Sequence, residues 1–485
     1  MYDYTVIGAG YGGLAASALL QKKGFKVLLL EAHTEIGGCA SFYDRKNFRF
    51  DVGATTFSGI KPNQPIGKLF TELEIKPELI KIEPGICIIK DYKKIYRYSD
   101  LEKWINEIEK FFPNKKMRDF WERIHRIDEN AWNLLHENKF LPPRKFIDLI
   151  SLVKIQNIKK ISLLLSSFES MSRFLTRLNL YSIEFKEFLD ELLWITTQTT
   201  SDNAPTLTAA MGLAYPAETY YPIGGMISVA EKILEKFIDC GGVYLNKKEV
   251  TKILEEKNYY SIKTSSGDEF LSKGIVSNIP IWNMEEITEG KIQKYFGNFV
   301  KKYPSTWSAF TVYFAIESNF DLETCYYQIH TKTQIPNCEP KAFFVSFSHK
   351  QDTKKAPSGF KTVTISTHTN SKEWIGIPKE EYKAKKAKTI EFILTEFDRA
   401  FPELRESKKL FVLGGTAKSF EDYTFRKNGF VGGIPHTVIP HLLQMPPNET
   451  AFPNLYMVGD TVFPGQGTPA VVQSAWNVVN RILRN

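Results

Sequence analysis

Short apolar runs and a helical repeat alternate over the first thirty residues. Residues 4–7 are aromatic or β-branched and residues 27–30 are all apolar, as expected of strands buried in a parallel sheet. Residues 14–23 are rich in alanine and leucine, and Gly24 follows where a helix C-cap would lie. The pattern predicts a strand, a helix and a second, parallel strand.

Similar patterns return in the middle of the chain. Residues 227–237 place apolar side chains at helical spacing, with a glycine pair at each end. Residues 243–281 predict a strand, a hairpin around Ser266 and Gly267, and a short buried strand at 274–277. These elements have the composition needed to extend the same sheet.

The two long stretches between these units differ from each other. Helical spacing dominates residues 60–220. Residues 282–423 contain three strand-like segments followed by a charged helix, at 308–317, 342–349, 361–368 and 379–400.

The composition is that of a globular protein with 43% hydrophobic and 24% charged residues. A length of 485 residues favours two or three domain-like units. Aromatic residues reach 13%, which suits a large apolar cavity as well as an ordinary core. The net charge of +8 is dispersed and accompanies no recognition motif, so nucleic-acid binding is not expected.

Cysteine and histidine usage bears on compartment and metal binding. The five cysteines are scattered without a CxxC pair, and the eight histidines show no ligand spacing. We therefore expect no disulfide framework, no metal site and a cytoplasmic location. The chain begins directly with a strand pattern, and no apolar run approaches the roughly 18 residues of a spanning helix.

A basic, apolar segment at residues 140–176 has two interpretations. Leucine, isoleucine and valine alternate there with lysine and arginine, and Asp148 is the only acid before Glu169. Such a segment can lie in an anionic membrane interface, which would make the protein peripheral on a membrane. It can equally form a helix pair packed on the protein, because its apolar positions wrap too widely for one clean stripe.

A dinucleotide-binding pattern occupies the first predicted turn. Gly8, Gly10 and Gly13 form G-x-G-x-x-G between the strand and the helix. The first glycine permits the tight turn, the second lets the backbone approach a pyrophosphate, and the third allows close helix packing. Glu31 ends the second strand, where a ribose-binding acid is expected. The acid disfavours a 2′-phosphate, and therefore NADP.

A second candidate site lies near the C-terminus. A predicted strand at 455–458 ends on Gly459 and Asp460, and a loop rich in glycine and proline leads to a predicted helix at 470–483. The positive end of that helix would face whatever ligand the loop binds. In the same loop, two glycines suit close backbone approach.

The residues that open this helix have suitable types. Gly467 ends the loop, Thr468 suits an N-cap, and Pro469 suits the first helical position. Both ends of the chain thus carry complementary parts of one predicted site.

Several motifs together carry a family resemblance: "GAGYGG", a "GG" pair followed by Ser41, "FDVGATTF", "YPIGGM" and "GDTVFPGQGTPAVVQSA". They resemble the FAD-binding superfamily of amine oxidases, carotenoid desaturases and isomerases, and Rab escort proteins. The chain is most similar to the carotenoid desaturase and isomerase family, whose relatives include the retinol saturases. The resemblance is specific at both ends of the chain and loose between them.

This resemblance implies FAD as the cofactor. Asp460 would bind the ribityl chain, the Gly459 amide would face a phosphate, and the Val250 backbone would touch the adenine. No cysteine follows Cys338, so the cysteine linkage found in many amine oxidases is absent and noncovalent FAD is expected. The expected cofactor-binding residues are Gly8, Ala9, Gly10, Gly12, Gly13, Glu31, Ala32, Gly37, Gly38, Ser41, Gly53, Val250, Asn278, Gly459, Asp460, Gly467, Thr468, Pro469 and Ala470.

The resemblance also implies a fold and a division of the chain. The expected fold class is α/β: a Rossmann-like FAD-binding domain of the amine-oxidase/desaturase type with an inserted α+β substrate domain. The FAD-binding domain is expected at 1–59, 221–281 and 424–485. The substrate domain is expected at 60–220 and 282–423, with the segment at 140–176 as its membrane contact.

Family membership would make the protein an oxidoreductase acting on a long apolar polyene, carotenoid or retinoid-like. Desaturation and saturation transfer a hydride between a substrate carbon and flavin N5, whereas isomerisation changes no net redox state. All three need the same site, so the reaction and the electron acceptor stay open. A noncovalent-FAD amine oxidase is an alternative. A non-enzymatic prenyl or lipid carrier of the Rab escort type is another, against which Glu31 and the Gly459–Asp460 loop argue.

No side chain is nominated as a catalytic acid or base. His436, Asp422 and Glu218 are the candidates by residue type, and a structural role is favoured for each.

Overall fold

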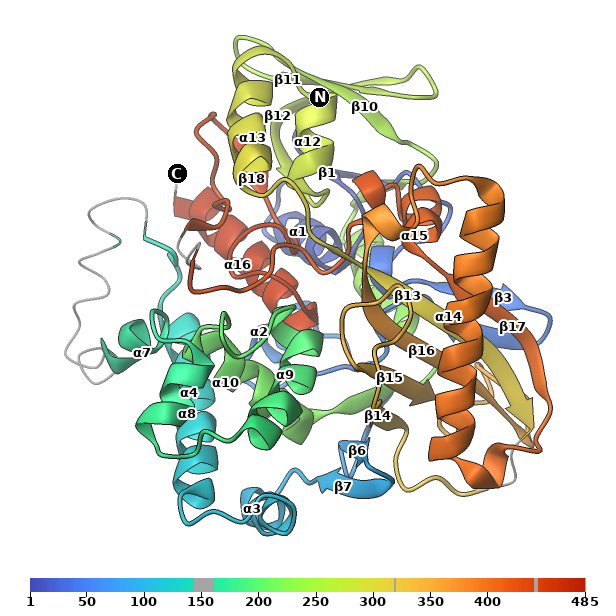
Figure 1. Cartoon of the computed structure of the whole chain (residues 1–485). Coiled ribbons are helices and arrows are strands. Elements are labelled where there is room, and N and C mark those ends of the chain that lie inside the picture. The colour runs from blue at the N-terminus through green and yellow to red at the C-terminus, as the bar shows by residue number, and fades with distance from the viewer. Residues whose placement is uncertain (144–147, 149–160, 318–319, 440–443, 485) are drawn as a thin grey trace.

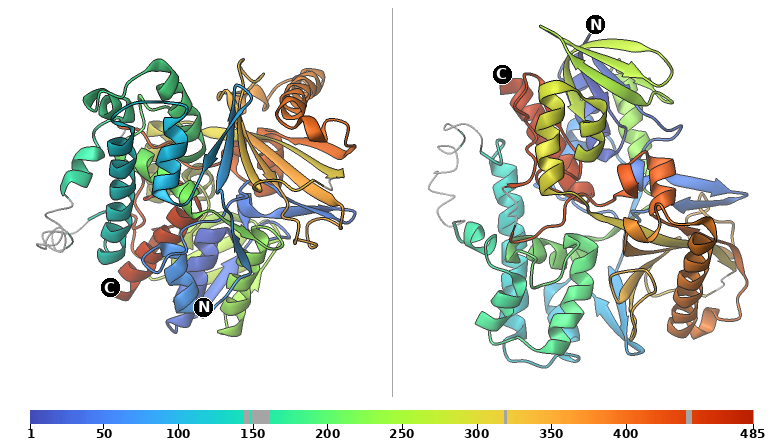
Figure 2. Two further views of the ribbon diagram at one scale, coloured as in Figure 1. Left: turned by 90° about the horizontal axis from the view of Figure 1, so that it is seen from below. Right: turned by 45° about the horizontal axis from the view of Figure 1, so that its top comes forward.

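The computed structural model describes residues 1–143, 148, 161–317, 320–439 and 444–484 (Figure 1). Two large sheets organise these residues, and a layer of helices lies beside the second sheet (Figures 1 and 2). Both chain termini lie in the part of the molecule that contains the first sheet. Two small strand pairs complete the described strands: β3 (Phe42–Arg45) with β4 (Phe48–Asp51), and β5 (Leu79–Lys81) with β8 (Tyr220–Pro222).

The first sheet combines strands from both ends and the middle of the chain. Its order is β10-β11-β12-β1-β2-β9, and β18 pairs with β12. The predicted first two strands, β1 and β2, are parallel, and β12 and β18 run parallel with them. The strands are β1 (Tyr2–Ile7), β2 (Val27–Leu30), β9 (Val243–Leu245), β10 (Val250–Glu255), β11 (Tyr260–Thr264), β12 (Glu269–Ser277) and β18 (Leu455–Met457).

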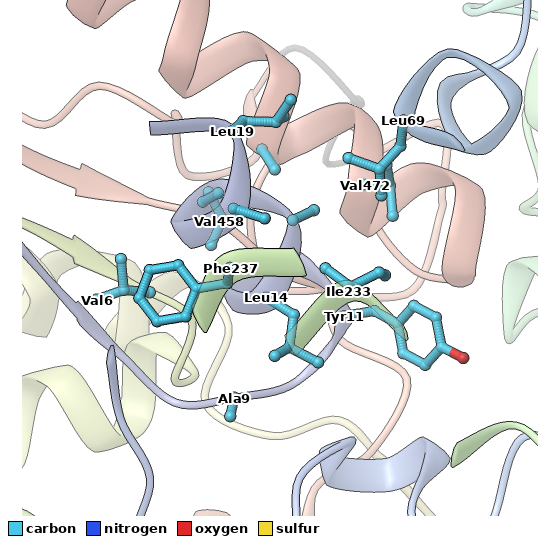
Figure 3. Packing of buried hydrophobic residues seen from close by; sticks show 14 of the residues in the cluster. Val6, Ala9, Tyr11, Leu14, Leu19, Leu69, Ile233, Phe237, Val458 and Val472 are labelled. Atoms are coloured by element: carbon cyan, nitrogen blue, oxygen red, sulfur yellow. The ribbon is translucent and has the colours of Figure 1, made fainter. Parts of the chain in front are cut away.

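Four helices cover one face of this sheet: α1 (Tyr11–Lys22), α2 (Pro65–Leu73), α11 (Ile227–Asp239) and α16 (Thr468–Arg484). Figure 3 shows side chains from all four entering one core, among them Leu14, Leu69, Ile233 and Val472. The opposite face is covered by α12 (Ile281–Ile287) and α13 (Gly290–Lys302), which contribute buried Trp282 and Phe296. Burial on both faces explains the continuous apolar pattern of β2.

The second sheet has the order β17-β13-β16-β15-β14-β6-β7. The long helix α14 (Lys379–Ala400) packs against one face, where the rings of Phe314 and Phe397 lie 5.2 Å apart. The short helix α15 (Ala417–Thr424) follows β17. The strands are β6 (Ile86–Lys90), β7 (Lys93–Arg97), β13 (Trp307–Glu317), β14 (Tyr326–His330), β15 (Ala342–Phe347), β16 (Phe360–Asn370) and β17 (Lys409–Gly415).

The helical layer lies beside the other face of the second sheet (Figure 1). Its core contains buried Trp104 and Trp121, whose rings lie 5.0 Å apart, and it continues into the sheet through Tyr326 and Phe344. The helices are α3 (Leu101–Glu109), α4 (Met117–Glu137), α7 (Ile161–Ser166), α8 (Met171–Arg177), α9 (Ile183–Thr197) and α10 (Thr206–Ala214).

The predicted α/β fold class with a Rossmann-like sheet is confirmed, and so are most predicted elements. β2 and α14 have the predicted bounds. The sequence predicts Thr468 to be the N-cap of the last helix. The helix instead starts at Thr468, which is therefore its first residue. The stretch 60–220 is mainly helical, but it also contributes β6 and β7. The sequence pattern does not predict these strands, because a five-residue run such as ICIIK is too short to reveal its period.

The packing of three helices bears on the predicted division of the chain. The helices α2, α12 and α13 come from stretches assigned to the substrate domain, yet they pack on the first sheet. Residues 144–147 and 149–160 of the segment at 140–176 lie outside the described residues; its described part includes α7 and most of α8.

Candidate functional site

The turn between β1 and α1 has the geometry that its glycines predict. Gly8 has a φ of +92°, a left-handed conformation that favours glycine. A Cβ on Gly13 would lie 2.0 Å from the carbonyl oxygen of Gly8, so only glycine lets the helix approach the strand this closely. The free amides of the first turn of α1 consequently point toward the carboxyl end of the parallel strands.

Glu31 lies at that same edge, directly after β2. Its Oε2 accepts a hydrogen bond of 2.6 Å from the Ala9 amide, and its Oε1 accepts one of 2.9 Å from the His33 amide. Burial raises the pKa of the Glu31 carboxyl, although the two amide bonds oppose that shift. The Ala9 carbonyl accepts from the Gly37 amide, which ties the second glycine pair to the first turn.

Asn278 connects the two ends of the chain. A Cβ on Gly12 would lie 2.7 Å from Asn278 Oδ1 and 3.2 Å from the Gly459 nitrogen. The Gly459 amide donates to Ser474 Oγ at 2.9 Å, within the C-terminal helix. The start of α1, the end of β12 and the start of α16 therefore meet around one side chain.

Asp460 forms an ion pair that the sequence patterns do not indicate. Its Oδ2 lies 2.7 Å from Nη2 of Arg426, and both side chains are largely buried. Burial by itself lowers the pKa of Arg426, but Asp460 and then Cys39 outweigh it, and the pKa lies above its ordinary value. Asp460 is thus held by a permanently charged partner.

One large cavity is lined by most of these residues. It has a volume of about 1450 Å³ and extends from the glycine turns of the first sheet to the second sheet and the helices α4, α9 and α10. Every expected cofactor-binding residue lines it except Ala9 and Gly13, which act through the backbone and through helix packing. Ser41 is among them, and no described residue partners its buried Oγ.

The part of the cavity away from the glycines lies between α9 and the second sheet. Trp194, Ile195 and Phe344 provide apolar walls there, and the ring of Trp194 packs 5.0 Å from that of Trp307. A volume of about 1450 Å³ exceeds the roughly 300–1,000 Å³ of an ordinary small-molecule site. The cavity therefore has room for two ligands, one on the glycines and one between α9 and the sheet.

Comparison with known proteins identifies this arrangement. The family model described as "Flavin containing amine oxidoreductase" matches residues 11–483. The chain belongs to this family of flavoenzymes. Its fold also resembles cyclohexylamine oxidase from Brevibacterium oxydans, with a TM-score of 0.62 and 14% identity over 100% of both chains.

The chain is also similar to curated proteins over nearly its whole length. Prolycopene isomerase 2 of an Oncidium hybrid is 27% identical over 99% of this chain and 84% of its own length. A 4,4'-diapophytoene desaturase of Methylomonas is 22% identical, covering 97% of this chain and 93% of its own. The all-trans-retinol 13,14-reductase of Danio rerio is 22% identical, covering 94% and 82%.

The donor set in the cavity fits a flavin nucleotide. The N-terminal ends of α1 and α16 both reach it, and free amides at helix starts suit phosphate oxygens. Glu31 and Asp460 provide carboxylates for hydroxyl groups, and the unpartnered Ser41 hydroxyl adds a further polar group. These residues could hold the flavin that the family contains.

The three candidate acids and bases of the flavoenzyme occupy different surroundings. Asp422 pairs with Lys418 at 2.7 Å and does not line the cavity. Glu218 lines it and pairs with Lys61 at 3.1 Å. His436 lines it beside the C-terminal loop, and burial lowers the pKa of its imidazole to about 4, so the ring is neutral at pH 7.

Two cavity carboxyls that the sequence patterns did not single out have strongly shifted pKa values. Burial raises the pKa of Asp128, on α4, to about 7, although Lys61 and Trp132 lower it. Burial likewise raises the pKa of Glu191, on α9, to about 7. Neither acid has a sequence signal, because both lie at ordinary positions of predicted helices, and their burial arises only when the helices pack around the cavity.

Among the residues that the structure describes, no group of three histidine, cysteine or acidic side chains could hold a metal ion. None of the helices seen in those residues combines the length and apolarity needed to cross a bilayer. All five cysteines are free thiols.

Proposed function

We propose that the protein is an FAD-dependent oxidoreductase or isomerase whose substrate is a long apolar polyene of the carotenoid or retinoid type. The observation that carries this proposal is the continuous cavity, which connects a dinucleotide-binding edge with a second, mainly apolar compartment. The curated relatives, a prolycopene isomerase, a diapophytoene desaturase and a retinol reductase, support a polyene in that compartment.

Noncovalent FAD is proposed at the glycine edge. The amides at the start of α1 would bind the pyrophosphate, and Glu31 would accept from the ribose hydroxyls. Asp460, oriented by Arg426, would accept from the ribityl hydroxyls, and the backbone at Val250, which lines the cavity, would contact the adenine. The positive end of α16 would face the ring system.

The chain's own contribution to the reaction is proposed to be positioning and exclusion of water. When bound, the flavin supplies hydride transfer to or from a substrate carbon. Trp194, Ile195 and Phe344 would hold a flat apolar chain against the loop that ends at Gly467. His436 is neutral at pH 7 and lies beside this loop, so it would not attract or repel a charged group there.

We also propose a division of the chain close to the one expected from its sequence. The FAD-binding part would contain the first sheet with α1, α11 and α16, and also α2, α12 and α13, which pack on it. The substrate part would contain the second sheet and the helices α3, α4 and α7 to α10. Contact of residues near 140–176 with a membrane surface belongs to the same proposal, since an apolar polyene has to leave a bilayer.

The two alternative functions have less support. A carrier needs no flavin, whereas this chain belongs to a flavin-containing family. Cyclohexylamine oxidase shares the fold with this chain, but a likeness at 14% identity supports the fold alone and not a common substrate. The curated relatives named above are isomerising, desaturating and saturating enzymes of polyenes.

Cofactor content provides the first test. Purified protein should show oxidised-flavin absorption, and denaturation should release FAD into solution. Glu31→Leu removes the carboxylate proposed for the ribose, and we expect FAD affinity to fall about tenfold to a hundredfold. Glu256→Leu, at an exposed acid between β10 and β11, should retain wild-type affinity. A colourless protein that gains no flavin on incubation with FAD would overturn the proposal, whereas flavin binding would lead to polyene assays in liposomes with and without reductant.

A further inference from the structure

The cavity lining supplied by α9 has polar residues at both ends, with apolar Trp194 and Ile195 and the hydroxyl-bearing Thr196 between them. Glu191, Trp194 and Ile195 line the cavity from one face of the helix, and Gln198, its C-cap, lines the cavity just beyond the last turn. Gln198 lies seven positions after Glu191, which corresponds to about 10 Å along a helix axis. This stripe is long enough to contact an extended ligand along its length.

Both ends of the stripe are hydrogen-bonded to the second sheet. At one end, Gln328 Nε2 on β14 donates to the Glu191 carbonyl at 2.7 Å. At the other, Trp307 Nε1 on β13 donates to the Gln198 carbonyl at 3.0 Å. Gln328 is opposite Phe344 on the neighbouring strand, and both line the cavity. These two hydrogen bonds therefore fix the position of α9 relative to this face of the second sheet.

The Gln198 end adjoins the C-terminal loop of the proposed flavin site. Gln466, in that loop, donates through Nε2 to the carbonyl of Thr196. His436 is packed against the same loop, since a Cβ on Gly465 would lie 2.1 Å from its Nε2. The Glu191 end is consequently the end of the compartment remote from the loop.

Two acceptor atoms at the remote end lack partners. Among the described residues, no donor lies within hydrogen-bond distance of the buried Glu191 Oε2 or of the buried Gln328 Oε1. Glu191 Oε1 accepts from the Lys341 amide at 3.2 Å, so the carboxyl is anchored through one oxygen only. Buried polar atoms without partners are costly, and a ligand that supplied a donor would remove this cost.

We propose that Glu191 and Gln328 form a subsite for a terminal hydroxyl group, so that the substrate is a polyene alcohol that enters this end with its hydroxyl leading. This inference rests on the proposed function and specifies its substrate class. The hydroxyl would donate its hydrogen to one of the two unpartnered acceptors, while the carbon chain would lie along Trp194, Ile195 and Phe344. A pure hydrocarbon would leave both acceptors unsatisfied, and the site would therefore disfavour it.

Equilibrium binding to the purified full-length protein tests the subsite without turnover. The probes are all-trans-retinol, its methyl ether and the hydrocarbon in which hydrogen replaces the hydroxyl, titrated by polyene absorption at pH 8.5. Burial raises the pKa of Glu191 to about 7, so at pH 8.5 the carboxylate only accepts. We expect wild-type protein to bind the alcohol about tenfold to a hundredfold more tightly than either other probe.

Variants assign the preference to this end of the cavity. Glu191→Leu should reduce the preference to less than about threefold while hydrocarbon binding stays equal or improves, and Glu191→Gln, which keeps an acceptor, should restore part of it. Glu187→Leu, at an exposed acid one turn away on α9, should keep the full preference. Circular dichroism would verify that each variant is folded.

Equal affinities of the wild type for the three probes, or a full preference in folded Glu191→Leu, would overturn the subsite. The flavin spectrum is recorded on the same samples. A protein that carries FAD without the preference contradicts only the subsite, whereas one that carries no FAD contradicts the proposed function independently of the binding result.

Discussion

At the scale of single residues, burial determines the chemistry of the cavity acids. Asp128 lines the cavity, and burial raises its pKa from 3.8 to about 7, while Lys61 and Trp132 oppose the shift and Glu129 and Glu218 add to it. Glu31, at the glycine edge, keeps two amide donors that partly offset its burial. Charged groups in this cavity are therefore stabilised by individual partners, and an acid with few partners stays protonated to a higher pH.

Asp128 should make folding stability depend on pH. Its native pKa is higher than that of the unfolded chain, so its stabilising contribution is complete below about pH 4 and is lost as the pH rises through about 7. Asp128→Asn cannot ionise, and at pH 8 it should be more stable than wild type by on the order of 1–2 kcal/mol. For a chain of this length that corresponds to about 1–2 °C in Tm.

Differential scanning fluorimetry of both proteins at pH 5 and pH 8 checks this expectation. The Tm difference should be present at pH 8 and should shrink or reverse at pH 5. An equal difference at both pH values would show that the amide acts through packing and that Asp128 does not titrate as its burial indicates.

At the scale of elements, the close contact of α1 with β1 positions the phosphate-binding amides. Gly13 makes this contact possible, because any larger side chain would meet the Gly8 carbonyl at 2.0 Å. The same helix packs on α16 and α11 through fully buried Leu14 and its neighbours (Figure 3). A shift of α1 would thus disturb the first sheet's core and the candidate site together.

Gly13→Ala should be strongly destabilising for this reason. Overpacking against rigid backbone costs about 3 kcal/mol or more, and FAD content should fall with stability. The matched control is Gly24→Ala, also at a glycine bordering α1. Gly24 has a φ of +90° with no neighbouring atom within 4 Å, so only backbone strain of about 1 kcal/mol is expected. Urea unfolding measures both, and similar costs for the two variants would contradict the packing argument.

At the scale of the whole molecule, three distant segments form one sheet, and one cavity joins that sheet to the second. Ligand binding should therefore stabilise the whole chain. At a free FAD concentration of 100 Kd, the expected gain is about 2.7 kcal/mol, or about 3 °C in Tm for 485 residues. Calorimetry should show one transition that moves as a unit. Two transitions, of which FAD shifts only one, would show that the two sheets unfold separately.

The sequence by itself determined the local elements of the flavin edge. The glycine turn, the acid after β2 and the last helix could be predicted because each depends on backbone conformation and on residues close in sequence. Gly8 and Gly13 carry these signals directly, whereas Thr468 marks the start of the last helix only approximately, as its first residue and not its N-cap. The family resemblance then related the two ends of the chain to each other.

Tertiary structure alone decided which side chains share the cavity. Arg426 reaches Asp460, and Glu191 meets Gln328, through contacts between elements that no sequence period connects. The burial that shifts the pKa of Asp128 likewise exists only after α4 packs beside the cavity. Backbone preferences are local and can be recognised in a sequence, whereas burial and partner choice depend on long-range packing, and therefore the cavity's chemistry emerged only from the folded chain.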